Sequence, residues 1–173
     1  MRARRILAPV VAALDAVTIL LAAIAAAAAV LMAGAYVWEV AARYVFGAPT
    51  DWAHDLVTYL LCATVMLALP EVTRRNGHVA VTVLSDRAPA RIAPPLLVLL
   101  ALVSAAVCLA AAWILLGENL RQFRRGIETL ATLPVPKWWI SSMITLGLSL
   151  SGLQFLVSAA GLRAPCAKPA GAA

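Results

Sequence analysis

The chain has 173 residues, of which 64% are hydrophobic and 13% charged, and its formal net charge at pH 7 is +6. Its mean hydropathy of +0.92 lies far outside the range of soluble domains and predicts an integral membrane protein. The excess of basic residues does not indicate a nucleic-acid partner, because arginine and lysine at membrane flanks orient the protein and contact anionic membrane lipids.

Four long apolar runs indicate transmembrane helices, because crossing a bilayer takes roughly 20 apolar helical residues. The predicted helices cover about residues 9–46, 52–70, 94–121 and 138–162. Backbone polar groups in lipid must pair within their own segment, and these runs are far too long for the strands of a barrel. We therefore expect an all-α integral membrane protein with four transmembrane helices in a single membrane domain, residues 1–173.

The first run could also be a cleaved signal peptide. Its start, Met1–Arg5, is basic, and Ala33, Gly34 and Ala35 resemble a cleavage site. The apolar stretch of a signal peptide spans only about 7 to 15 residues, so we expect a retained signal anchor instead. At roughly 1.5 Å per residue this helix exceeds the bilayer thickness, and it must tilt strongly or project from the membrane.

Two features of the first run bear on its packing. The consecutive alanines Ala25–Ala29 either pack against another helix or reflect the alanine preference of a high-GC genome. A carboxylate inside a membrane is a candidate functional group, and Asp15 is one. Because Asp15 lies within about two turns of the predicted helix start, we expect it to reach the lipid headgroups or to pair with Arg4 or Arg5.

The segment between the first two runs predicts a tight hairpin. Gly47 and Pro49 open a short loop, and Arg43 and Asp55 flank it. We expect these two residues to form an ion pair at the outer interface. An exposed pair of this kind contributes only about 0 to 1 kcal/mol.

Residues 78–88 are too short to span a membrane and are bounded by Gly77 and Pro89. Apolar side chains at 79, 80, 83 and 84 would form a stripe on a helix, whereas the alternation of 79, 81 and 83 would suit a strand. Next to a membrane we expect a short amphipathic helix lying in the interface, where it contacts lipid or a partner.

The basic residues predict the orientation. With both termini in the cytoplasm, nine of the 14 Lys and Arg residues lie inside and five outside, which the positive-inside rule favours. Tryptophans favour membrane–water interfaces, and Trp38, Trp52, Trp138 and Trp139 fall on the predicted outer side.

The sequence shows no set of residues suited to catalysis, to metal binding or to a cofactor. The second run separates His54 from His78, so one haem cannot bridge them within a chain. Cys62, Cys108 and Cys166 lack the paired spacing of a disulfide or metal site. Hydroxyls in the last run, between 141 and 151, more often bond to backbone or neighbouring helices than to a substrate. We expect neither an enzyme nor a substrate site.

Several short motifs lie near the ends of the apolar runs. In chain order they are Arg43, Tyr44 and Phe46, then Trp52 and Asp55, then Arg74 and His78, and finally Pro136 and Trp138. In their order and spacing they resemble the small membrane subunit of tripartite ATP-independent periplasmic (TRAP) transporters. The chain departs from the usual family pattern at Asp55, which is more often Glu, at Thr82, which is often Asp, and near Met143, where a proline is expected.

The resemblance implies a noncatalytic subunit of the bacterial inner membrane. Such a subunit braces the large permease subunit and helps to dock a periplasmic solute-binding protein for sodium-coupled uptake of organic acids. It implies no cofactor in this chain, because the sodium gradient acts through the large subunit, and it makes the nine motif residues structural or interface candidates. The alternative is a four-helix scaffold or assembly factor of an unrelated complex.

Overall fold

The computed structural model describes residues 2–47, 50–75, 93–129 and 134–161, and within them it is helical. The helices are α1 (Arg2–Val45), α2 (Asp51–Arg74), α4 (Ala93–Arg125) and α5 (Lys137–Ala159). All four are long and apolar enough to cross a membrane, so the predicted all-α fold with four spans is confirmed. The predicted interfacial helix 78–88, with His78, lies outside the described residues.

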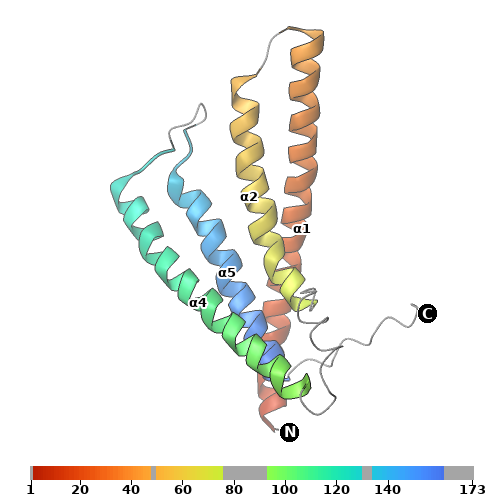
Figure 1. The fold of residues 1–173 in the computed structure, drawn as a ribbon, viewed down its shortest axis with the longest axis vertical. Coiled ribbons are helices and arrows are strands. Elements are labelled where there is room, and N and C mark those ends of the chain that lie inside the picture. Colours follow the sequence, from red (N-terminus) through yellow and green to blue (C-terminus); the bar gives the residue numbers. More distant parts are fainter. Residues whose placement is uncertain (1, 48–49, 76–92, 130–133, 162–173) are drawn as a thin grey trace, which may run out of the picture.

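The helices form two antiparallel hairpins, α1 with α2 and α4 with α5 (Figure 1). We call the end where α1 passes into α2 and α4 into α5 the hairpin end, and the opposite end the terminal end. α5 joins the hairpins, because it packs against both α4 and α2, whereas α4 contacts neither α1 nor α2. Toward the hairpin end the two hairpins diverge (Figure 1).

Small residues form the interior. Ala25 of α1 packs with Ala63 and Leu67 of α2, and Met143 of α5 lies against this cluster. Ala25 and Ala28 are buried, whereas Ala26 and Ala27 between them are exposed, so packing accounts for one face of the alanine-rich stretch only. Side chains this small let helix backbones approach closely, which is how helices associate when lipid weakens the hydrophobic drive between them.

The closest approach between the hairpins occurs where α2 contains a proline. Pro70 has no N–H to donate to the carbonyl of Met66, one turn earlier. Gly147 of α5 lies against that carbonyl so closely that a Cβ atom would collide with its oxygen. Gly152 has a similar role toward α4, because its Cβ would lie 2.8 Å from Cγ of Leu109. Glycines therefore determine where α5 meets its neighbours.

Two helices extend beyond their predicted ends. α2 continues through Pro70 to Arg74, because packing against α5 tolerates the missing hydrogen bond. α4 continues to Arg125, because charged residues end a membrane span without ending a helix. α4 then ends at Gly126, whose φ of 59° suits a residue without a side chain, and the amide of Ile127 bonds to the carbonyl of Gln122 at 3.3 Å.

Candidate functional site

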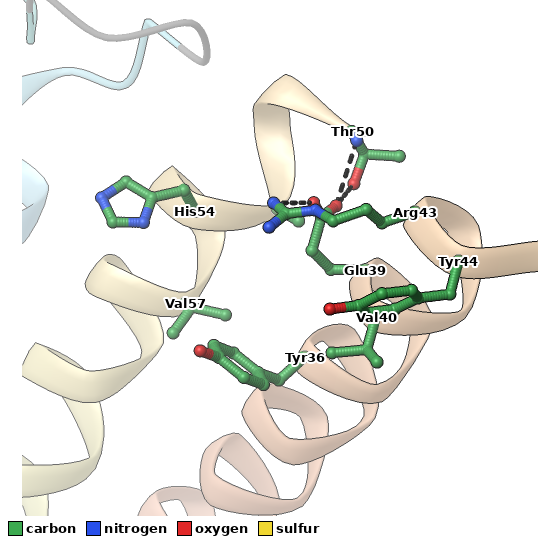
Figure 2. Close-up of a pocket in the computed structure, with 9 residues that line it drawn as sticks. Tyr36, Glu39, Val40, Arg43, Tyr44, Thr50, His54 and Val57 are labelled. Atoms are coloured by element: carbon green, nitrogen blue, oxygen red, sulfur yellow. Dashed lines mark hydrogen bonds and ion pairs between the residues drawn. The ribbon is translucent and has the colours of Figure 1, made fainter. Parts of the chain in front are cut away.

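A pocket of about 450 Å³ lies at the hairpin end, between the last turns of α1 and the first turns of α2 (Figure 2). Its polar lining comes from Tyr36, Glu39, Arg43, Tyr44, Thr50 and His54, and its apolar lining from Val40, Ala53 and Val57. The pocket is the described feature that most resembles a binding site.

Glu39 organises the pocket. Its side chain is only 14% exposed, and Nη2 of Arg43, one helical turn later, donates to its Oε1 at 2.9 Å. The backbone N–H of Thr50 donates to Oε2 at 3.1 Å, and the Thr50 hydroxyl donates to the same oxygen. The carboxylate thereby connects the end of α1 to the start of α2 and closes the hairpin.

Arg43 therefore has a different partner from the one expected. We predicted an ion pair with Asp55, but the guanidinium pairs with Glu39 on its own helix (Figure 2). Residues four apart face the same side of a helix, so this pair forms without any help from the loop. Glu39 was not among the predicted site residues, although its spacing of four from Arg43 was a usable signal.

Of the other predicted motif residues, some lie at or near the pocket and others lie elsewhere in the bundle. Tyr44 lines the pocket, whereas Phe46 and Trp52 are exposed near it and Asp55 lies on α2 outside its lining. Arg74 lies at the terminal end.

Pro136 and Trp138 belong to the start of α5. Pro136 precedes its first turn and forms an isolated bridge with Glu128. The ring of Trp138 meets Phe123 of α4 edge to face, with centroids 5.4 Å apart. These two motif residues thus shape the α4–α5 hairpin and lie away from the pocket.

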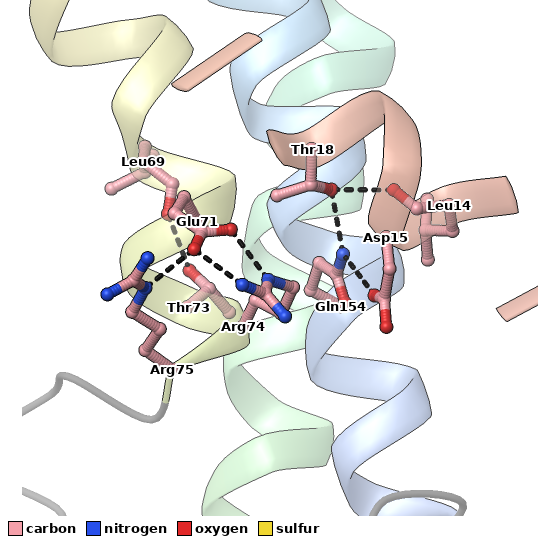
Figure 3. A network of polar contacts seen from close by, with 9 residues as sticks. All are labelled: Leu14, Asp15, Thr18, Leu69, Glu71, Thr73, Arg74, Arg75 and Gln154. Atoms are coloured by element: carbon pink, nitrogen blue, oxygen red, sulfur yellow. Dashed lines mark hydrogen bonds and ion pairs between the residues drawn. The ribbon is translucent and has the colours of Figure 1, made fainter. Parts of the chain in front are cut away.

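A second polar cluster joins three helices at the terminal end (Figure 3). Gln154 of α5 is fully buried, and its Nε2 donates to Oγ1 of Thr18 at 2.8 Å and to Oδ1 of Asp15 at 3.4 Å. The Thr18 hydroxyl in turn donates to the carbonyl of Leu14. Asp15 thus contacts α5, which the sequence analysis did not expect, and its charge also attracts Arg74. The predicted pairing with Arg4 or Arg5 involves side chains outside the described part.

Glu71 holds the remaining charges of this cluster. Arg74 donates to both carboxylate oxygens at 2.6 Å, and Nε of Arg75 donates to one of them at 2.6 Å. The Glu71 side chain is 11% exposed. Each buried polar side-chain atom in the described residues has a hydrogen-bond partner, and these residues contain no group of His, Cys, Asp and Glu suited to a metal.

The hydroxyls of α5 behave as predicted. Ser142, Thr145, Ser149 and Ser151 donate to carbonyls one turn earlier in their own helix, and Ser141 donates to Gln122 of α4 at 2.8 Å. They are used for backbone and interhelical bonds.

The fold and its two polar sites define a multi-pass helical membrane protein with small-residue helix contacts. The family described as tripartite ATP-independent periplasmic transporters, DctQ component, matches residues 32–164. The chain belongs to this family, which is the small permease component of TRAP transporters. The matched residues include the pocket and Gln154 but begin after Thr18. No curated protein matches the chain.

Proposed function

We propose that the chain is the small noncatalytic subunit of a TRAP-type secondary transporter. It braces the large permease subunit and helps to dock a periplasmic solute-binding protein for sodium-coupled uptake of organic acids. The family match over most of the helical bundle is the observation that supports this function best.

The distribution of side chains supports a bracing role. α4 contacts only α5, and its large apolar residues Val107, Trp113 and Ile114 are 63%, 77% and 72% exposed. In a membrane, such faces meet lipid or another membrane subunit. We propose that cargo and sodium bind to the large permease subunit and not to this chain.

We further propose that both termini are cytoplasmic in a bacterial inner membrane. The hairpin end then faces the periplasm, where the solute-binding protein docks, and residues 78–88 lie at the cytoplasmic interface. The exposed tryptophans Trp38, Trp52 and Trp139 all lie toward the hairpin end, as expected of an outer interfacial belt.

Purification of the tagged chain from its native membrane in mild detergent tests the proposal. We expect a large polytopic permease to copurify in near-equal amount, identified by mass spectrometry. In liposomes, the chain alone should give no saturable uptake of organic acids, and uptake should need the permease, the binding protein and a sodium gradient. Recovery of the chain alone, or with an unrelated complex, would instead support the scaffold alternative.

A further inference from the structure

Several polar groups around the hairpin-end pocket are not used by the protein itself. Arg43 donates from one nitrogen to Glu39, and the rest of its guanidinium is free in a side chain that is 61% exposed. Among the described residues, the hydroxyls of Tyr36 and Tyr44 and the imidazole of His54 have no hydrogen-bond partner. Figure 2 shows the tyrosine hydroxyls and the guanidinium directed from α1 toward α2. The tyrosine hydroxyls and the guanidinium thus face one space, whereas the His54 imidazole is directed away from α1 (Figure 2).

Arg43 is the cationic side chain of the lining, and it is far more exposed than the Glu39 carboxylate that pairs with it. The carboxylate of Glu39 is 14% exposed and already accepts hydrogen bonds from Arg43 and twice from Thr50. Arginine has five N–H donors in a planar fork, which matches the paired oxygens of a phosphate. The donor set of the pocket therefore suits an anionic oxygen ligand.

The apolar walls of the pocket indicate that its ligand also has an apolar part. Val40 and Val57 line it beside the polar groups, and the apolar surface continues along α1 through Val37, which is 69% exposed. Trp38 and Trp52 are exposed at the same level, and tryptophan concentrates at membrane–water interfaces. A ligand at this depth has an anionic group beside apolar chains, which is the chemistry of a phospholipid.

We propose that this pocket binds the phosphodiester group of a phospholipid. Arg43 pairs with the phosphate, the hydroxyls of Tyr36 and Tyr44 donate to its oxygens, and an acyl chain lies along Val40 and Val57. The groups that form the site all belong to this chain, from α1 to the first turns of α2.

The test is lipid binding to the delipidated full chain in detergent, followed by native mass spectrometry. The probes are dioleoylphosphatidylglycerol, dioleoylglycerol without the phosphate, and glycerol 3-phosphate without the acyl chains. We expect the phospholipid to bind at least about tenfold more tightly than either of the others. Equal binding of dioleoylglycerol would show that the phosphate is not recognised and would contradict the proposal. Equal binding of glycerol 3-phosphate would show a site for soluble phosphates and overturn the lipid assignment.

Variants locate the site. Arg43→Gln should weaken phospholipid binding about tenfold, because a charge-assisted pair is lost. Arg125→Gln is the matched control, since Arg125 is exposed at the end of α4 and has no ion-pair partner in the described part of the chain. It should change binding less than about twofold. An equal loss in both variants would show nonspecific attraction to basic residues and contradict the proposal.

Arg43→Gln also removes the ion pair with Glu39 and could weaken binding by disturbing the α1–α2 hairpin. A second variant therefore leaves that ion pair intact. Tyr36→Phe combined with Tyr44→Phe removes two hydroxyl groups and leaves both rings in place. This double variant should weaken phospholipid binding about threefold and leave dioleoylglycerol binding unchanged. If phospholipid binding stays at the level of the unmodified chain, the pocket is not the binding site.

Discussion

The two ends of the bundle use their polar residues in opposite ways. At the terminal end, the buried Gln154 bonds α5 to Thr18 of α1, Glu71 pairs with the arginines at the end of α2, and the charge of Asp15 attracts Arg74. At the hairpin end, Glu39 bonds the end of α1 to Thr50 before α2, and exposed tyrosines and an arginine surround an open pocket. One end therefore holds the helices together, and the other presents groups to its surroundings.

This difference follows from where small residues permit contact. Gly147 lets α5 meet α2 midway along the bundle, and Gln154 joins α5 to α1 below that point. Beyond the glycine contact the hairpins diverge, and α1 continues with exposed side chains such as Val37 and Tyr44 (Figure 1). At the terminal end Gln154 and Thr18 are fully buried, so their polar groups must bond to one another.

The largest effect concerns the orientation of the two ends. In a chain with Cys62, Cys108 and Cys166 replaced by alanine, Glu128→Cys places a thiol at the hairpin end and Ala160→Cys places one at the terminal end, both at exposed positions. A membrane-impermeant maleimide should label the first in intact spheroplasts and the second only after permeabilisation. The reverse pattern would overturn the proposed orientation of both ends.

The contact between the hairpins is tested next, with Gly147→Ala. The new methyl group collides with the backbone of α2, which cannot move aside as a side chain can. We expect a loss of about 1 to 3 kcal/mol in stability, measured as lower thermal resistance in detergent. Gly34→Ala is the control, because open space surrounds that position on α1, and it should be neutral or stabilising by up to about 1 kcal/mol.

The polar contacts at the terminal end are tested by a pair of buried glutamines, one toward each end. Gln154→Leu leaves Asp15 and Thr18 without their bonds to α5 and should cost about 1 to 2 kcal/mol. Gln122→Leu removes one interhelical bond, from Ser141 of α5, and a long 3.4 Å bond to Glu118 on its own helix, and should cost only about 0.6 kcal/mol. Thermal unfolding of the two variants side by side measures the difference. Equal losses would contradict a special role for the terminal end.

The smallest effect concerns a single link between the hairpins near the hairpin end. The hydroxyl of Tyr59 on α2 donates to Oγ1 of Thr129, in the segment after α4, at 3.1 Å. Tyr59→Phe should reduce stability by about 0.5 to 1 kcal/mol, seen as a small downward shift in melting temperature. A loss as large as that of Gln154→Leu would mean that polar contacts at the two ends contribute equally to stability.

Sequence reasoning predicted the helices well because a membrane span is a local property. About 20 consecutive apolar residues suffice to indicate one, whatever the rest of the chain does. The same reasoning predicted correctly that the hydroxyls of α5 bond to backbone and a neighbouring helix, since a hydroxyl in lipid has few other partners. It assigned the wrong partner to Arg43, because it considered a residue across the loop and not the carboxylate one helical turn earlier.

The sequence by itself determined the class of protein, the number of spans and, through its ordered motifs, the family. Only the tertiary structure decided which polar residues meet. Gln154 and Thr18 lie 136 positions apart, and no local pattern relates them until α5 packs beside α1. The pocket likewise exists only where the end of α1 meets the start of α2, where Thr50 donates to Glu39. The length of an apolar run predicts a single helix from local sequence, whereas these polar sites form only where two or more helices pack together.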